Sequence, residues 1–391
     1  MTADLPAPPR RAAVTGWLAA LERKAELRAR AGLARQLRPR RPADPAVDLA
    51  GNDYLGLSGH PEVVAAAAEA LTAYGLGATG SRLVRGSTEA HGALEAELAG
   101  WLGTGRALVY SSGYLANLGV LRALSGPRTV LVADAHCHAS LVDGCRLAGA
   151  TTVVTPHLDL AAVDAALRAA GGPAVVITES VFSVDGDAAP LPELHRLARE
   201  RGAVLLVDDA HGLGVIGPGG AGGVAGAGLA GAPDVVVTAT LSKALGGAGG
   251  VVAGPEPLVR HLVDTGRTFL FDTALPPAVV AGVRAALRLA RAADGRRAEL
   301  RRRVAAAGRT LARAGLAATA RPAGGVVSVP APSAAAAVGW AAGCAGRGVA
   351  VGCFRPPSTP DHRSRLRLTV NAGIPGPDFA AALAVVAETA P

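Results

Sequence analysis

The stretch VVVTATLSKALGGAGG (Val235–Gly250) places Lys243 between a β-branched apolar run and a glycine-rich segment. The chain has 39 Lys and Arg residues, and only two of them, Lys24 and Lys243, are lysine. Arginine stays protonated and cannot condense with an aldehyde, whereas a lysine amine in an apolar pocket can lose its proton and form a Schiff base. Lys243 is therefore either a catalytic lysine or a lysine left at the end of a strand, and the surrounding segments must distinguish the two.

Short β-branched runs alternate with helical segments along the middle of the chain. The run DVVVTAT at the start of this stretch is preceded by RALVY, TVLVAD, TTVVTP, AVVITES and AVLLVDD. This alternation is typical of a parallel sheet that helices cover on both faces. The sequence therefore predicts an α/β fold with a mostly parallel central sheet.

The 391 residues exceed the usual length of one domain, roughly 100–200 residues, so we expect a large domain and a smaller one. Residues 1–47 are interpreted as an N-terminal helical segment, and residues 48–280 as the large α/β domain. Residues 281–391 contain an Arg/Ala-rich helix and the runs GVVSVPA, GVAVGCF and SRLRLTV, which predict a smaller C-terminal α+β domain. The N-terminal helix is inferred from leucines at roughly helical spacing, Leu18, Leu21, Leu33 and Leu37.

The net charge of +8 raises nucleic-acid binding as an alternative class. The arginines gather within residues 10–41 and 291–313, where acidic residues are interspersed and there is no aromatic interleaving for base stacking. These segments are typical of solvated helix faces, so no nucleic-acid partner is expected. A basic surface also attracts an anionic substrate such as a coenzyme A ester.

Targeting and metal-binding patterns are missing from the sequence. The N-terminal stretch MTADLPAPPRR has no apolar core of a signal peptide, and no long apolar run is suited to span a membrane. The four cysteines show no C-x-x-C spacing, so neither a metal site nor a disulfide framework is expected. We therefore expect a cytoplasmic protein without a membrane partner.

Chemically useful side chains follow the strands. Ligands of parallel α/β sheets bind beyond the carboxyl ends of the strands. Those ends carry SSGY, DAHCHAS, TESVFSVDGD, VDDAHG and TATLSK. We expect one rim of the sheet to present His138, Glu179, Ser183, Asp185, Asp208, His211, Thr240 and Lys243.

The segment GLGVIG (residues 212–217) matches the G-x-G-x-x-G pattern of dinucleotide-binding proteins. It is followed by PGGAGGVAGAG, which is no helix former, so a pyrophosphate would lack the helix N-terminus that binds it. A Rossmann dehydrogenase is not expected.

Pyridoxal 5'-phosphate fits the rim better. This cofactor needs a lysine, an acid opposite its ring nitrogen, donors for its phosphate and a flat group against its ring. Asp208 can keep the ring nitrogen protonated, and the backbone of SSGY with Thr240 can hold the phosphate. His211 is either a ligand of the phenolic oxygen of the cofactor or a hydrogen-bonded core histidine, and the residues alone leave that choice open.

Six motifs resemble the α-oxoamine synthases, a fold-type I pyridoxal phosphate family that condenses an amino acid with an acyl-CoA and releases carbon dioxide. They are NDYLGLSGHPEV, GATGSRLVRGSTEAH, SSGYLAN, TESVFSVDGD, VDDAHGLGVIG and TLSKALGGAGG, in family order, and the resemblance runs from about Arg28 to Arg367. The motif sequences are most similar to those of family members that join L-alanine to a pimeloyl thioester of coenzyme A or of a carrier protein in biotin biosynthesis. Glycine-using members, and aminotransferases or lyases of the same fold, are the alternatives.

The resemblance implies roles for individual residues. Lys243 would be the Schiff-base lysine, His138 would lie against the ring of the cofactor and touch the substrate, Asp208 would meet the ring nitrogen, and His211 would meet the phenolic oxygen. Further cofactor contacts are implied for Gly113, Tyr114, Ser183 and Thr240. Substrate contacts are implied for Arg28, Asn52, Ser358 and Arg365, with Arg365 receiving the carboxylate of the amino acid.

Thr273 matches a phosphate contact from a neighbouring subunit, so the resemblance also implies a homodimer. Asp272 departs from the family pattern, which has a small hydroxyl residue there. Because an acid beside a phosphate is unfavourable, we expect Asp272 to point away or this contact to be rearranged.

Overall fold

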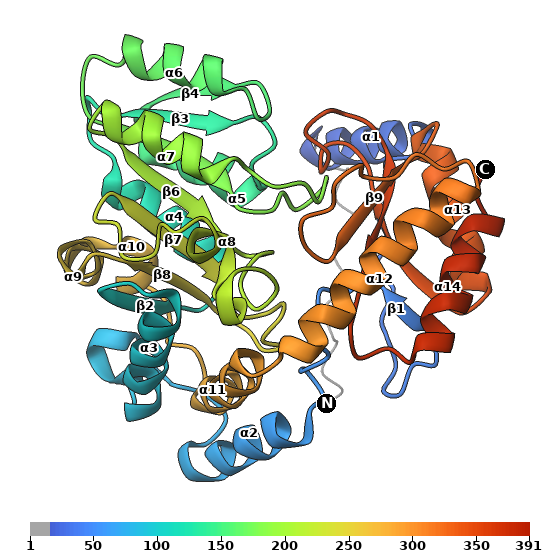
Figure 1. The fold of residues 1–391 in the computed structure, drawn as a ribbon, viewed down its shortest axis with the longest axis horizontal. Helices are drawn as coiled ribbons and strands as arrows, with labels where there is room; N and C mark the ends of the chain where they lie inside the picture. Colours follow the sequence, from blue (N-terminus) through green and yellow to red (C-terminus); the bar gives the residue numbers. More distant parts are fainter. Residues whose placement is uncertain (1–15) are drawn as a thin grey trace, which may run out of the picture.

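The protein is described by a computed structural model that covers residues 16–391 (Figure 1). The stretch MTADLPAPPRR and the first part of the expected 1–47 segment lie outside the described residues. The described chain forms one seven-stranded and one four-stranded sheet.

The seven-stranded sheet has the order β2-β8-β7-β6-β5-β3-β4. Neighbouring strands are parallel except where β8 pairs with β7 and β2, so the expected mostly parallel α/β fold is confirmed. The six β-branched runs all form strands, and β8, which follows the glycine-rich segment, was not predicted. The strands are β2 (Arg106–Tyr110), β3 (Val130–Asp134), β4 (Thr151–Thr155), β5 (Ala174–Glu179), β6 (Val204–Asp208), β7 (Val235–Thr240) and β8 (Gly250–Gly254).

Helices cover both faces of this sheet (Figure 1). Alternation along the strands sends Leu205 and Val207 into one apolar core and Leu206 into the other. The first core contains side chains from α3 (Glu89–Leu102), α6 (Leu160–Ala169), α7 (Leu191–Glu200), α8 (Gly222–Gly226) and α11 (Pro277–Arg291). The second contains side chains from α4 (Gly113–Leu124), α5 (Ala139–Ala148), α9 (Glu256–Thr265) and α10 (Arg267–Leu270), while α2 (Pro61–Tyr74) packs on α11.

The four-stranded sheet has the order β1-β10-β11-β9. Its strands are β1 (Val47–Leu49), β9 (Val326–Pro330), β10 (Val349–Phe354) and β11 (Arg365–Thr369). It is accompanied by α12 (Asp294–Arg313), α13 (Ala334–Gly346) and α14 (Gly376–Glu388), on the right in Figure 1. The edge strand β1 was not predicted, and it pairs in parallel with β10 of the C-terminal region.

The expected domain limits at 47/48 and 280/281 stay predictions, and the structure places both of them inside elements. The first falls within β1 and the second within α11. The N-terminal helix α1 (Gly16–Arg30) is shorter than the leucine spacing suggested. It ends before Gly32, whose φ of 67° is left-handed, and the Leu37 side chain beyond it is 93% exposed.

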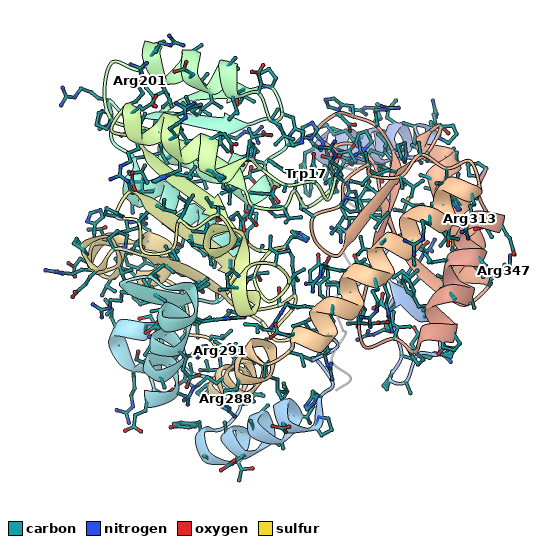
Figure 2. All side chains as sticks on the ribbon, viewed as in Figure 1. Trp17, Arg201, Arg288, Arg291, Arg313 and Arg347 are labelled. Carbon is teal, nitrogen blue, oxygen red and sulfur yellow. The ribbon has the colours of Figure 1, made fainter. Side chains whose placement is uncertain are left out.

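Exposed arginines project from separate elements of the molecule. Figure 2 labels five of them, two on α11, one at the end of α12 and one each directly after α7 and α13: Arg288, Arg291, Arg313, Arg201 and Arg347. Their spread agrees with solvated helix faces better than with one basic stripe for a nucleic acid. Within residues 16–391, no helix combines the length and apolar character needed to cross a membrane.

Candidate active site

The register of the large sheet brings the polar strand ends together. Glu179 pairs with Asp208 across β5 and β6, and Asp208 pairs with Thr238 across β6 and β7. Beyond these ends lies a cleft of about 1230 Å³ between the two sheets. Of the expected site residues, Arg28, Asn52, His138, Ser183, His211, Lys243 and Ser358 line it.

Lys243 lies in the loop that follows β7, with its amine in the cleft. Its Nζ is 2.7 Å from Nε2 of His211. Burial lowers the pKa of Lys243 to about 8, although the charges of Asp208 and Glu179 act in the opposite direction. Near neutral pH a fraction of this amine is therefore unprotonated, which both a nucleophile and a general base require.

Asp208 is buried at the end of β6 and is held by two donors. Its Oδ1 accepts a hydrogen bond from the backbone N–H of Ala210 at 3.0 Å, and its Oδ2 accepts one from Nδ2 of Asn117 at 2.7 Å. The amide of Asn117 is itself fixed, since its Oδ1 accepts from the hydroxyl of Thr238 at 2.6 Å. Asn117 belongs to the quoted motif SSGYLAN, but no role was assigned to it from the sequence.

Glu179 is a second buried carboxylate beside Asp208. It accepts hydrogen bonds from the backbone N–H groups of His138, at 2.6 Å, and Ser183, at 3.0 Å. Burial, followed by the charge of Asp208, raises the pKa of Glu179 well above its ordinary value. Glu179 thus ties together the two loops that carry His138 and Ser183.

His138 caps the N-terminus of α5. Its Nδ1 lies 2.8 Å from Oγ of Ser140 and accepts a hydrogen bond from the Ser140 backbone N–H at 3.2 Å. Burial lowers the pKa of His138. The ring is therefore anchored at one edge and presents an uncharged, flat surface at the cleft.

His211 is fully enclosed between two partners. Its Nε2 faces Lys243, and its Nδ1 is 2.5 Å from the phenolic oxygen of Tyr54. Burial lowers the pKa of His211 well below its ordinary value. Tyr54 lies in the quoted motif NDYLGLSGHPEV, and sequence reasoning missed it as a neighbour of the site.

The N-terminus of α4 forms a cradle at the edge of the sheet. Ser112 caps this helix by accepting a hydrogen bond from the Leu115 N–H at 3.1 Å. A Cβ on Gly113 would lie only 3.1 Å from Cβ of Thr240, so only a small residue fits there comfortably. The free N–H groups of a helix N-terminus favour an anion. The O–H of Tyr114 donates a hydrogen bond to Oδ2 of Asp143 at 2.6 Å. Only the backbone of Tyr114 is therefore left to contact an anion in the cradle.

Asp272 and Thr273 lie close to this cradle. The hydroxyl of Ser111 donates a hydrogen bond to Asp272, and Thr273 pairs with Ser81 in an antiparallel bridge. The acid is therefore bound to its own chain beside the start of α4. Of the two expected outcomes, a rearranged contact agrees better with this position than an acid that points away.

The assignment of Arg365 to the substrate carboxylate stays a prediction, and the structure offers a second arginine, Arg367, for that role. The guanidinium of Arg365 is occupied by Asp185 and Asp361, and Arg365 does not line the cleft. Arg367 does line it. Both arginines lie on the same face of β11 because side chains two residues apart point the same way, so the sequence pattern does not choose between them.

Arg367 is held in place by two hydrogen bonds, which use only part of its set of N–H donors. It donates to the carbonyl of Ser183 at 2.9 Å and to Oδ1 of Asn52 at 3.0 Å. Its buried Nε has no hydrogen-bond partner among the described residues. The expected substrate residue Ser358 accepts a hydrogen bond from Arg35 at 2.8 Å.

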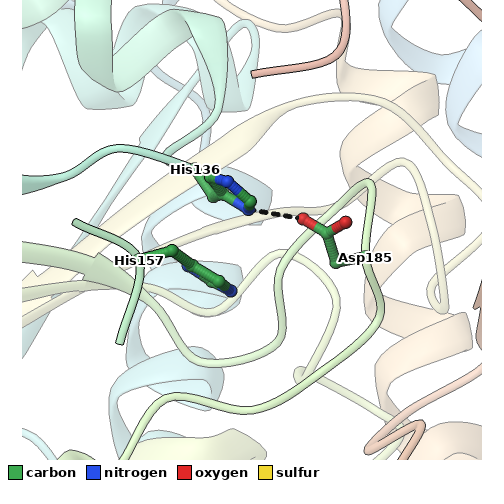
Figure 3. A group of neighbouring side chains, drawn as sticks. All are labelled: His136, His157 and Asp185. Atoms are coloured by element: carbon green, nitrogen blue, oxygen red, sulfur yellow. Dashed lines mark hydrogen bonds and ion pairs between the residues drawn. The ribbon is translucent and has the colours of Figure 1, made fainter. Parts of the chain in front are cut away.

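A second polar cluster, at the edge of the cleft, consists of His136, His157 and Asp185 (Figure 3). Nδ1 of His136 is 2.7 Å from Oδ2 of Asp185, and the two imidazole rings are stacked with centroids 3.9 Å apart. Burial alone would lower the pKa of His157, but hydrogen bonds to Asp134 and Asp187 outweigh it and raise that pKa to about 9. The nitrogens of His157 are thus occupied and the rings lie parallel, which suits an ion-pair network better than a metal. The expectation of no metal site stays a prediction.

Comparisons with known proteins agree with this arrangement. The family model of aminotransferase class I and II matches residues 44–386. The 8-amino-7-oxononanoate synthase of Mycolicibacterium smegmatis is 54% identical over 380 residues, which cover 95% of this chain and 96% of that one. The corresponding enzyme of Mycobacterium bovis is 53% identical over 92% of this chain and 91% of that one.

Solved structures with a similar fold belong to enzymes of the same kind. A serine palmitoyltransferase of S. paucimobilis, solved with PLP and myriocin bound, has a TM-score of 0.89 at 28% identity and covers 96% of this chain and 98% of that one. The 8-amino-7-oxononanoate synthase of Francisella tularensis has a TM-score of 0.76 at 25% identity over 88% of this chain and 97% of that one. The chain therefore belongs to the class I and II aminotransferase family and, within it, to the α-oxoamine synthases.

Proposed function

We propose that the protein is a pyridoxal phosphate enzyme that joins L-alanine to a pimeloyl thioester and forms 8-amino-7-oxononanoate, the free carrier thiol and carbon dioxide. One observation carries the proposal: 54% identity to an 8-amino-7-oxononanoate synthase extends over nearly both chains. Three motif residues, Lys243, His211 and His138, line one cleft, and Asp208 pairs in register with Glu179, which binds the backbone of His138; this arrangement supports the proposal.

The residues of the cleft fit pyridoxal phosphate. Lys243 offers an amine of lowered pKa for the aldehyde, and Asp208 offers a fixed carboxylate for the ring nitrogen. The capped N-terminus of α4, with Gly113 against Thr240, offers a place for the phosphate. His138 would lie against the ring, and His211 and Ser183 would hold its oxygen substituent. When bound, this group supplies an aldehyde that joins amines and a ring that withdraws electrons from the adjacent carbon.

The other residues bind the substrates and move protons. Arg367, which lines the cleft, would bind the carboxylate of alanine through its guanidinium, and Asn52 holds that guanidinium in place. The Lys243 amine would take the proton from the α-carbon of alanine. Arg28 and Ser358, on the opposite side of the cleft, would contact the acyl thioester.

We also propose that the enzyme is a homodimer. Three large apolar side chains close in the chain to Thr273 or to its bridge partner Ser81 are mostly exposed in the single chain: Leu83, Val84 and Phe271. A patch of exposed apolar side chains is typical of a subunit interface. A partner seated on this patch would bring its own Thr273 region close to this chain.

Absorption and substrate preference test the proposed function. The purified protein should show the visible absorption of bound pyridoxal phosphate, and thiol release should be fastest with alanine and pimeloyl-CoA. We expect this pair to exceed glycine with acetyl-CoA by at least roughly tenfold in kcat/KM, since a methyl group and an acyl chain are recognised together. A preference for glycine with acetyl-CoA would instead indicate a 2-amino-3-ketobutyrate CoA ligase.

A further inference from the structure

Three buried side chains form a continuous hydrogen-bonded row that ends at the reactive lysine. The phenolic oxygen of Tyr54 lies 2.5 Å from Nδ1 of His211, and Nε2 of His211 lies 2.7 Å from Nζ of Lys243. The Tyr54 and His211 rings meet edge to face at an interplanar angle of 66°. Tyr54 has no exposed surface and comes from the segment before α2, whereas His211 follows β6.

The number of protons on this row follows from its burial. Burial raises the pKa of Tyr54, so the phenol keeps its proton. Burial lowers the pKa of His211 well below its ordinary value, so the imidazole is neutral and carries one N–H. Two arrangements of the row satisfy these conditions.

In the first arrangement, Tyr54 donates its O–H to Nδ1 of His211, and Nε2–H donates to the unprotonated amine of Lys243. In the second, Lys243 donates to Nε2, and Nδ1–H donates to the phenolic oxygen. The second arrangement leaves the Tyr54 O–H without an acceptor, because His211 is its only hydrogen-bond partner among residues 16–391. A buried O–H without an acceptor makes the second arrangement about 5- to 150-fold less populated than the first.

We infer that Tyr54 is a positioning residue that fixes His211 as the Nε2–H tautomer, so that His211 points an N–H donor into the cleft at Lys243. This donor is repelled by an ammonium and accepted by a free amine, so it favours the unprotonated form of Lys243. The same N–H suits the phenolic oxygen of pyridoxal phosphate, and only that last point depends on the proposed function.

Other charges also act on the row. Asp208 and Glu179 favour the protonated form of Lys243, and Arg367 opposes it. Arg367 and His138 also act on His211. None of these four makes a hydrogen bond to His211 in the described chain, so the choice between the two ring nitrogens rests on its two hydrogen-bond partners, Tyr54 and Lys243.

Nitrogen NMR of the full-length chain without cofactor tests the inference directly. With ¹⁵N-histidine, the chain has 9 histidines, and the His211→Gln variant identifies the signals of His211. We expect the wild-type signals to be those of an Nε2–H imidazole. An Nδ1–H imidazole in the wild type would overturn the inference without any variant of Tyr54.

The Tyr54→Phe variant supplies the second test. It should lose the fixed tautomer, and the pH midpoint for labelling Lys243 with trinitrobenzenesulfonate should rise by about 0.5–1 unit because Nε2 can then accept from the ammonium. Tyr110→Phe is the matched control, since Tyr110 is also buried but its hydroxyl has no partner among the described residues. An unchanged tautomer and midpoint in Tyr54→Phe would refute the positioning role. Both measurements are independent of turnover, so their failure is distinct from failure of the proposed function.

Discussion

Replacing Arg367 by alanine is the sharpest test of how the cleft recognises its amino acid. The guanidinium is held by Ser183 and Asn52, which use two of its five N–H donors, and it lines the cleft, so further donors are left for a ligand. A hydrogen bond between a charged donor and a carboxylate contributes about 1.5–3 kcal/mol. Arg367→Ala should therefore lower kcat/KM for alanine by about 10- to 150-fold, mainly through KM.

The assay measures thiol release while alanine is varied at saturating pimeloyl-CoA. Arg365→Ala is the matched control, because Arg365 lies on the same face of β11 but is paired with Asp185 and Asp361. Breaking a buried ion pair costs about 3–5 kcal/mol, so this control should lose thermal stability while its folded fraction keeps a nearly normal KM for alanine. If Arg365→Ala raised the KM for alanine more than Arg367→Ala did, our assignment of the carboxylate site would be refuted.

Three further changes address the lysine, the subunit interface and the polar cluster. Lys243→Arg should abolish turnover and the cofactor absorption, since arginine forms no imine, whereas Lys24→Arg on exposed α1 should change neither; retained activity in Lys243→Arg would contradict the assignment. Val84→Asp should convert the dimer to a monomer in light scattering, whereas Val154→Asp, at an exposed site on edge strand β4, should not; a dimeric Val84→Asp protein would place the interface elsewhere. His157 has a pKa raised from 6.5 to about 9, so its ion pairs add stability that is complete below pH 6.5 and is lost as the pH rises through 9. In urea unfolding, His157→Gln should have a lower free energy of unfolding than the wild type at pH 6, and this difference should shrink by about 1–3 kcal/mol at pH 10. A difference that stays constant between the two pH values would argue against a charged His157.

The sequence predicted the part of the fold that local patterns determine. Six β-branched runs indicated six strands, and the residues after them indicated the rim that carries Asp208 and Lys243. The strand β1 was missed because three residues carry no periodicity and their partner β10 is distant in the chain. The helix α1 was predicted too long because Leu33 and Leu37 continue a helical spacing beyond the turn at Gly32.

The site residues that the sequence did not reveal were missed for a different reason. Tyr54 and Asn117 act through partners more than 90 residues away, His211 and Asp208 respectively, so no local pattern reveals them. Arg365 and Arg367 alternate identically with the leucines of β11. Only the packing of this strand against Asp185 and the cleft decides which arginine is free.

The pairing of β1 with β10 has a consequence for synthesis of the chain. These two strands are about 300 residues apart, and the whole seven-stranded sheet lies between them in the chain. A ribosome therefore releases β1 first, and every strand of the larger sheet follows before β10, the partner of β1, exists. We expect the larger sheet to form during translation, and β1 to wait unpaired until the C-terminal strands emerge.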